Sequence, residues 1–335
     1  MKKRLLTGIR TTGPLHIGHY FGAVQNIIKY QNEHETFVMG ADIQALTDNW
    51  ENPKKVTENV YQVFADLLAC GVNPDVSNIF LQSQISEIAE LTVLFSNLIT
   101  VNKLSRNPTI KTEIAQKSSL FGQNGESITF GFLGYPVSQA ADILSVMAEI
   151  VPVGQDQIPV LEITRDIVSK FNNIYGQTFK MPEIILASGA GSKIIGLDGN
   201  SKMSKSLGNC VYLSDSPQTT IDKFKAAKTD SFSEIIFDPE SRPEISNLIS
   251  LYSLVNGIDN SQSENDLKNV KYGAFKEKLG HDFNKYFSDI RLKREILIND
   301  KNQITEIIRR GNQKAKFTAS EVMEKVKSRL GINYL

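Results

Sequence analysis

Thr12-Gly13-Pro14-Leu15-His16-Ile17-Gly18-His19 is the stretch that decides the fold of this chain. It follows a short apolar run at residues 5–9, which is typical of a buried β-strand. From Tyr20 onward the apolar residues recur at helical spacing, so the quoted stretch lies where a strand passes into the N-terminus of a helix. Free backbone N–H groups and the positive end of the helix dipole favour an anion there. The stretch is therefore a candidate phosphate-binding element.

Gly18 and the two histidines give this turn its chemistry. Gly18 has no side chain, so a nucleotide could approach the backbone closely. His16 and His19 are three residues apart, point the same way on a first helical turn, and can each offer an N–H to a phosphate oxygen. A lone histidine usually serves packing or a surface hydrogen bond. Because two of only 4 histidines in the chain lie here, the pattern favours a functional site.

A second candidate for binding phosphate, Lys202-Met203-Ser204-Lys205-Ser206, lies far downstream. Glycines precede and follow it, so a loop is expected. The two lysines supply ammonium donors that can follow a moving polyphosphate, and the serines can form hydrogen bonds. The alternative is a solvated loop of lysine and serine, which would be the better interpretation of this segment alone.

Length and composition are those of an ordinary globular protein. The chain has 335 residues, with 41% hydrophobic and 22% charged side chains, so it can bury a large core and two domains are expected. No apolar run is long enough for a membrane span, and the run after the basic N-terminus is too short for a signal peptide, so we expect a cytoplasmic protein. With only Cys70 and Cys210, a disulfide scaffold and a four-cysteine metal site are excluded, and no protein-held metal is expected.

The charge balance limits how the chain could bind nucleic acid. It has 37 basic and 37 acidic side chains, whereas a protein that coats nucleic acid would be basic throughout. Only a local basic surface is expected. One candidate is the C-terminal stretch, with a solvated helix face as an equally good interpretation; its basic residues are Arg309, Arg310, Lys314, Lys316, Lys325, Lys327 and Arg329.

The first half of the chain alternates strand-like and helix-like segments. This alternation predicts an α/β fold with a parallel sheet covered on both faces, which binds ligands beyond the C-terminal ends of its strands. Residues 217–330 are expected to be mostly helical, with a polar loop or fraying helix end at 258–269. Strands are expected at 5–9, 36–40, 78–81 and 184–186, and helices at 52–71 and 91–104.

Residues 135–142 are the candidate segment for substrate choice. On a helix, Tyr135, Gln139 and Asp142 would share a face. Asp142 stands in an apolar run, where a carboxylate needs a partner, and an indole N–H, which only donates, would suit it. From these residues alone, a backbone N–H or a lysine is the preferred partner.

Taken together, these segments resemble the class I aminoacyl-tRNA synthetases, which pair a His-Ile-Gly-His motif with a Lys-Met-Ser-Lys-Ser motif in this order. The resemblance is closest to the tryptophanyl-tRNA synthetases, with further matches at residues 8–20, 41–47, 140–144, 151–157 and 243–248. It implies a Rossmann-like catalytic domain at residues 1–195 and, at 196–300, the lysine–serine loop with an α-helical anticodon-binding domain. The helix near 300–335 would pack back on the first domain.

The same resemblance implies an ATP-dependent tryptophan–tRNA ligase that forms a homodimer, with L-tryptophan and tRNA(Trp) as partners and Mg²⁺ bound with the nucleotide. The implied catalytic residues are His16, His19, Lys202 and Lys205. The implied ATP-binding residues are Arg10, Thr11, Thr12, Gly18, His19, Gly154, Gln155, Asp156, Ile194, Lys202, Met203, Ser204, Lys205 and Ser206, and Lys111 would add a phosphate contact. The implied tryptophan-binding residues are Leu6, Tyr135, Gln139 and Asp142.

Two other enzymes and a non-enzymatic paralogue remain as alternatives. Tyrosyl-tRNA synthetases share the pattern of residues 135–142 but carry a tyrosine in the first strand, where this chain has Leu6. Small-molecule nucleotidyltransferases share a His-x-Gly-His turn but lack the long helical C-terminal region, and the intact motif residues argue against a tRNA-binding paralogue without activity. Gln44 and Gln139 depart from the histidine and methionine of many tryptophan enzymes, so the polarity of the pocket stays open.

Overall fold

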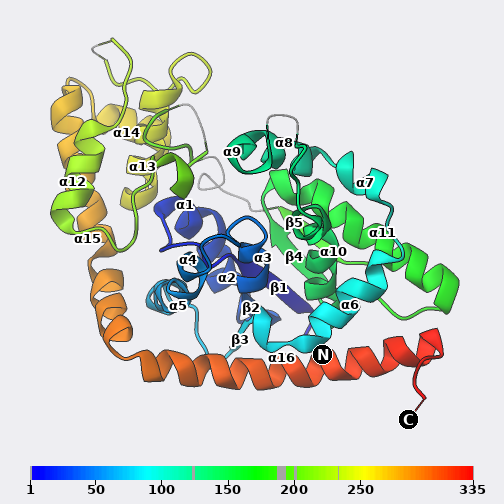
Figure 1. The fold of residues 1–335 in the computed structure, drawn as a ribbon. Coiled ribbons are helices and arrows are strands. Elements are labelled where there is room, and N and C mark those ends of the chain that lie inside the picture. The colour runs from blue at the N-terminus through cyan, green and yellow to red at the C-terminus, as the bar shows by residue number, and fades with distance from the viewer. Residues whose placement is uncertain (1, 123–124, 187–193, 200–201, 233, 335) are drawn as a thin grey trace.

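Five parallel strands form one sheet at the centre of the molecule, in the order β3-β2-β1-β4-β5 (Figure 1). The computed structural model describes residues 2–122, 125–186, 194–199, 202–232 and 234–334. The expected parallel sheet, and the four strands predicted from apolar runs, are confirmed. The strands are β1 (Arg4–Ile9), β2 (Glu35–Gly40), β3 (Ser77–Leu81), β4 (Ile150–Val153) and β5 (Glu183–Leu186).

The sequence analysis did not identify β4, although this strand lies inside the sheet. It is only four residues long and contains Pro152, which has no N–H to donate to a neighbouring strand. Its neighbours are β1 and β5, so the chain order reverses between β1 and β4. Such a reversal leaves a crevice beyond the C-terminal strand ends, where open α/β sheets bind their ligands. The turns at residues 12–19 and 154–156 begin at this crevice.

Two predicted helices are each broken into two. Residues 52–71 form α4 (Lys54–Thr57) and α5 (Val60–Ala69), and the break coincides with Asn59, whose side chain bonds the carbonyl of Lys55 at 2.7 Å instead of continuing the helix. Residues 91–104 fall in α6 (Ser86–Ser96) and α7 (Val101–Ser105). Here the Thr100 hydroxyl accepts the Lys103 N–H at 3.3 Å and starts a new helix.

The second half of the described chain is helical, as expected for residues 217–330, and most of it lies to one side of the sheet (Figure 1). The segment 258–269 is not a loop, because Asp259 caps a short helix by accepting the Gln262 N–H at 2.8 Å. The helices are α12 (Pro217–Ala226), α13 (Pro243–Asn256), α14 (Asn260–Asp266), α15 (Tyr272–Asn299) and α16 (Lys301–Leu330).

The last helix, α16, runs beneath the sheet and returns to its edge strand β3 (Figure 1). The Asn312 side chain accepts the N–H of Leu81 at 2.9 Å. At Gly311 the approach is so close that an added Cβ would lie 1.8 Å from the carbonyl oxygen of Ile79. The helix therefore covers an edge that would otherwise expose unpaired backbone groups.

The remaining helices connect and cover the strands. Among the described residues, no helix combines the length and the apolar character that a membrane span requires. The remaining helices are α1 (Ile17–His19), α2 (Gln25–Tyr30), α3 (Asp42–Leu46), α8 (Pro108–Gln116), α9 (Ser118–Phe121), α10 (Phe130–Ser145) and α11 (Ile158–Tyr175). Short helical turns are η1 (Tyr20–Val24), η2 (Gln82–Gln84), η3 (Gln155–Gln157) and η5 (Lys205–Leu207).

Candidate active site

The two histidines of the strand-to-helix turn contact each other, with ring centroids 3.7 Å apart and the ring planes tilted by 39°. Burial lowers the pKa of His16 to about 3 and the pKa of His19 well below its usual range, and the nearby Lys205 and Lys202 add to both shifts. Both rings are therefore neutral near pH 7. The Nδ1 atom of His19 accepts the backbone N–H of His16 at 3.3 Å, so the proton of His19 resides on Nε2, which can donate.

The lysine–serine segment lies directly against this turn. The chain after it pairs with the turn, since Ile17 N–H bonds the carbonyl of Val211 at 3.0 Å and Leu213 N–H bonds the carbonyl of Leu15 at 2.9 Å. Gly18 permits the close approach, because an added Cβ would lie 3.0 Å from the His16 ring and 3.5 Å from the Cβ of Met203. The structure thus brings the two candidate phosphate-binding segments together.

Each lysine of the segment has a partner that belongs to a different part of the site. Lys205 Nζ donates to the carbonyl oxygen of Gly13, and burial lowers the pKa of this lysine to about 8. Lys202 Nζ lies 3.0 Å from Asp156 Oδ2, in the turn after β4. A polyphosphate that reached these ammonium groups would have to take the place of the Gly13 carbonyl and the Asp156 carboxylate.

Unpaired polar atoms mark the same region. Among the described residues, the buried side-chain polar atoms without a hydrogen-bond partner include three that belong to predicted site residues: Arg10 Nε, Thr11 Oγ1 and His16 Nδ1. Buried polar groups are nearly always bonded in folded proteins. Their concentration here indicates a site that polar ligand groups complete.

Asp142 lies on α10 and is 1% exposed, as the apolar run around it predicted. Gln82 Nε2 donates to both of its carboxylate oxygens, at 2.8 and 3.0 Å. Burial, together with the like charge of Asp42, raises the pKa of Asp142 to about 7, although the Gln82 bond lowers it. The partner is therefore a buried amide and not the backbone group or lysine preferred from the sequence.

The other residues predicted to bind tryptophan are buried or half-buried. Leu6 on β1 and Tyr135 on α10 are buried in the same hydrophobic cluster, and Gln139 is half-buried. Burial also raises the pKa of the Tyr135 phenol, so this group remains a hydrogen-bond donor. The structure therefore places Tyr135, Gln139 and Asp142 on one helix at helical spacing, and it buries Leu6 in the same hydrophobic cluster as Tyr135.

The predicted nucleotide residues come from several separate parts of the chain. Arg10, after β1, pairs with Asp48, which also accepts Lys117 Nζ at 2.8 Å. Gly154, Gln155 and Asp156 form the turn after β4, and Ile194 is buried. Lys111 is exposed on α8, and the Ser206 side chain lies outside the described part of the structure.

Gln82 and Asp48 contact predicted site residues but were not identified from the sequence, and neither was Lys117, which pairs with Asp48. Gln82 follows the end of β3, and the rule that ligand groups follow strand ends could have found it. No local pattern points to Asp48 or Lys117, because their roles depend on Arg10, which is distant in the chain.

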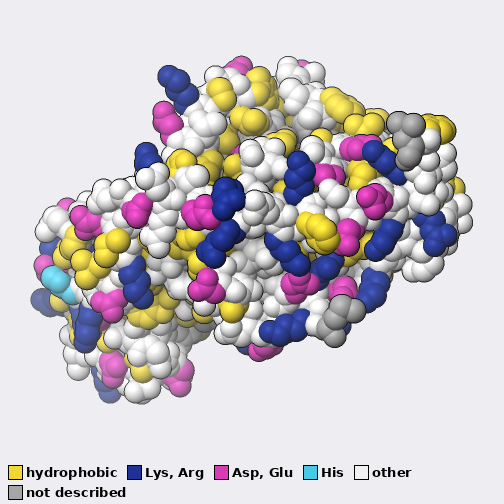
Figure 2. All heavy atoms as spheres, turned by 90° about the horizontal axis from the view of Figure 1, so that it is seen from below, with side chains coloured by type: hydrophobic (Ala, Val, Ile, Leu, Met, Phe, Trp, Pro, Cys, Tyr) yellow, Lys and Arg dark blue, Asp and Glu magenta, His cyan; other side chains and the backbone are white. Residues whose placement is uncertain are grey.

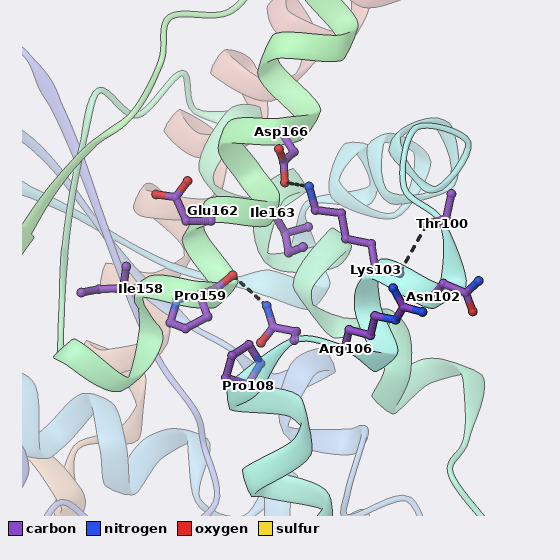
Figure 3. A pocket seen from close by; sticks show the side chains of 11 residues that line it. Thr100, Asn102, Lys103, Arg106, Pro108, Ile158, Pro159, Glu162, Ile163 and Asp166 are labelled. Atoms are coloured by element: carbon purple, nitrogen blue, oxygen red, sulfur yellow. Dashed lines mark hydrogen bonds and ion pairs between the residues drawn. The ribbon is translucent and has the colours of Figure 1, made fainter.

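A cavity of about 610 Å³ opens beside the site, between α7, α8 and α11 (Figure 3). Its lining holds none of the predicted substrate residues. Figure 3 shows Lys103 paired with Asp166 and a side-chain amide bonded to the carbonyl of Pro159; this amide is Asn107 Nδ2, at 2.8 Å. The next residues connect the cavity wall to the site, since Thr109 Oγ1 donates to the carbonyl of Asp156 at 2.7 Å.

Comparison with known proteins gives one consistent result. The family model "tRNA synthetases class I (W and Y)" matches residues 1–288. Tryptophan–tRNA ligases of Streptococcus agalactiae and Lactococcus lactis are each 42% identical to the chain, with 99% of both chains covered. The crystal structure of tryptophanyl-tRNA synthetase from Campylobacter jejuni, complexed with ADP and tryptophan, superposes with a TM-score of 0.83 at 32% identity and covers 98% of this chain and 99% of its own.

Proposed function

The chain belongs to the class I tryptophanyl-tRNA synthetases, and from this premise we propose which of its residues carry each part of the reaction. The activity is that of an ATP-dependent tryptophan–tRNA ligase. A carboxylate oxygen of tryptophan attacks the α-phosphorus of ATP, an O–P bond forms, and pyrophosphate leaves. A hydroxyl of the 3′-terminal ribose of tRNA then attacks the acyl carbon, and AMP leaves.

Catalysis in this reaction consists of positioning and of stabilising charge that moves toward the leaving pyrophosphate. The observation that carries the assignment is the convergence of two neutral imidazoles and two ammonium groups from distant parts of the chain. His19, through Nε2–H, and His16 would donate to phosphate oxygens. Lys202 and Lys205 would exchange Asp156 and the Gly13 carbonyl for the β- and γ-phosphates.

The same site would bind ATP together with its metal ion. Arg10, Thr11, Thr12 and Gly18 would contact ATP along the turn after β1, and the unpaired Thr11 hydroxyl supports this. Gly154, Gln155 and Asp156 would hold the ribose, and Ile194 would line the adenine. Among the described residues, no three His, Cys, Asp or Glu side chains gather to hold a metal. Mg²⁺ would enter with the nucleotide and would supply positive charge to its phosphates.

Tryptophan would lie against α10, with its indole N–H donated to Asp142 and its ring over Leu6. Tyr135 and Gln139 would complete this side of the pocket. An acceptor-only carboxylate suits a donor-only indole nitrogen. Leu6 offers no hydroxyl that could bind a phenol, which favours tryptophan over tyrosine.

Amino-acid-dependent pyrophosphate exchange tests this assignment directly. With ATP and tryptophan, labelled pyrophosphate should enter ATP, and tyrosine in place of tryptophan should support little exchange. The reverse preference would make the chain a tyrosyl enzyme. Exchange with neither amino acid would remove the proposed function altogether.

We also propose that the enzyme works in the cytoplasm as a homodimer and binds tRNA(Trp) through its helical second half. We propose as well that the catalytic domain ends at residue 195 and that the lysine–serine loop and the anticodon-binding domain begin at residue 196. Light scattering at several protein concentrations measures the oligomeric state. A monomer that aminoacylates tRNA at the full rate would contradict the proposed homodimer.

A further inference from the structure

Two turns that follow neighbouring strands are tied to each other by reciprocal hydrogen bonds. Strands β2 and β3 pair in parallel up to Gly40 and Leu81, and α3 and η2 begin directly beyond these ends. The N–H of Gln44 donates to Gln82 Oε1 at 3.0 Å, and the N–H of Ser83 donates to Asp42 Oδ1 at 2.9 Å. Each turn thus supplies a backbone donor to a side chain of the other.

This arrangement fixes the orientation of the Gln82 amide. The side chain is 0% exposed, and its carbonyl oxygen is taken by a backbone donor in the first turn of α3. The opposite orientation would set two donors against each other at Gln44 and two acceptors against each other at Asp142. The NH₂ group must therefore face Asp142, where it lies 2.8 and 3.0 Å from the two carboxylate oxygens.

Asp142 has little other support for a negative charge. Among the described residues, no cation and no second donor bonds its carboxylate, and the charged group that acts on it is Asp42, which carries the same sign. The helices α6, α11 and α16 pack against α10 without supplying an opposite charge to this site. A buried carboxylate in such surroundings favours its protonated form unless a fixed donor opposes this.

We propose that Gln82 is a positioning residue for amino-acid recognition. Its amide, held in one orientation by the Gln44 N–H, keeps Asp142 ionised and oriented to accept the indole N–H of tryptophan. The inference rests on the proposed role of Asp142. A protonated Asp142 would be a weaker acceptor, because it lacks the charge that strengthens the hydrogen bond to the indole N–H. The kcat/KM for tryptophan should therefore rise with pH as Asp142 loses its proton. Since burial places the pKa of this group at about 7, the rise should occur near neutral pH.

The test replaces the amide with an apolar side chain of similar length. Gln82→Met should raise the pH at which Asp142 ionises by about one to two units, because a hydrogen bond to the charged form is lost. The low-pH limb of kcat/KM for tryptophan should move by the same amount, a loss of about ten- to hundredfold at acidic pH. Gln84→Met, in the same turn but exposed, is the matched control and should change neither quantity.

Two measurements keep the outcomes separate. The Asp142 carboxyl is titrated by ¹³C NMR without substrate, with Asp142→Asn to assign the signal, and pyrophosphate exchange gives kcat/KM for tryptophan and ATP across pH. Gln82→Glu is the second variant: it can still accept the Gln44 N–H, but its carboxylate would share a proton with Asp142, so tryptophan use should fall more than a hundredfold near pH 7.

An unchanged Asp142 titration in Gln82→Met would overturn the inference. So would equal losses for tryptophan and ATP with an unshifted pH profile, because these indicate a loosened fold. If the titration shifts but the unmodified enzyme activates no tryptophan, the proposed function fails while the pairing of Gln82 with Asp142 stands.

Discussion

At the scale of single residues, burial sets the charge of the groups that meet at the active site. It lowers the pKa of His16 to about 3 and of Lys205 to about 8, and it raises the pKa of Asp142 to about 7. Each group is moved toward its neutral form. Lys205 nevertheless remains mostly in its ammonium form near pH 7, and a polyphosphate beside it would raise its pKa again, since a nearby negative charge favours the charged form. The substrate would therefore keep this lysine protonated to a higher pH.

Asp142→Asn should weaken the use of tryptophan far more than the use of ATP. The amide loses a charge-assisted hydrogen bond to the indole, which costs roughly 1.5–3 kcal/mol. In pyrophosphate exchange this is about a ten- to hundredfold loss in kcat/KM for tryptophan. An unchanged kcat/KM for tryptophan would show that Asp142 does not bind the indole nitrogen.

Lys205→Ala should slow adenylate formation by about a hundredfold while leaving tryptophan affinity nearly intact. The ammonium group meets the polyphosphate most strongly as charge moves to pyrophosphate, so its loss raises the energy of the transition state. Rapid-quench measurement of the first turnover gives this rate. Lys225→Ala, a surface lysine paired with Glu277, is the control. A normal first turnover in Lys205→Ala would leave the segment as a solvated surface loop.

At the scale of elements, the sequence predicts what depends on neighbours along the chain. Apolar runs located four strands, and the strand-to-helix turn located the histidines. The strand with Pro152 was missed because its pairing comes from β1 and β5, which are distant in sequence. Gln82 was missed for the same reason, since its partners belong to α3 and α10. The predicted site residues are brought together, but their partners are known only from the fold.

Gly311→Ala should destabilise the protein, because the added methyl would collide with the carbonyl of Ile79 on the edge strand. Overpacking of this kind costs typically about 1–3 kcal/mol. The melting temperature in thermal denaturation should therefore fall by several degrees. Gly273→Ala is the matched control, since no atom lies within 4 Å of its added Cβ and alanine favours a helix. Equal melting temperatures for the two variants would contradict the close packing of α16 on β3.

At the scale of the whole molecule, ion pairs join α16 to β2, to α6 and to the turn before β3. Arg310 lies 4.0 Å from Asp75, Lys314 lies 3.5 Å from Glu35, and Lys327 lies 2.8 Å from Glu90. The face seen from below carries basic and acidic side chains interspersed, with no continuous basic patch in view (Figure 2). Of the two interpretations of the basic C-terminal stretch, these pairs favour the solvated helix face over a nucleic-acid surface.

A second connection joins the helical half to the active-site turn. Asp66 on α5 is 0% exposed; its Oδ2 accepts the N–H of Leu15 at 2.6 Å, and its Oδ1 pairs with Arg294 on α15. Burial raises the pKa of Asp66 although Arg294 opposes this shift. One carboxylate thus holds both the residue before His16 and the long helix of the second half, so Asp66 is one route by which a change at α15 can reach the histidine turn.

Arg294→Met should destabilise the protein by about 3–5 kcal/mol, because it leaves a buried carboxylate without its cation. Adenylate formation should also slow, since a protonated Asp66 would hold the Leu15 N–H less firmly. The double variant Asp66→Asn with Arg294→Met should recover most of the stability, because the asparagine oxygen can still accept that N–H without a buried charge. Denaturant unfolding and pyrophosphate exchange measure the two effects.

The exposed pair of Arg309 with Glu306 supplies the control, since Arg309→Met should alter stability little. If Arg294→Met costs no more stability than Arg309→Met, or if the double variant is less stable than Arg294→Met alone, the charge on Asp66 is not what ties the helical half to the turn.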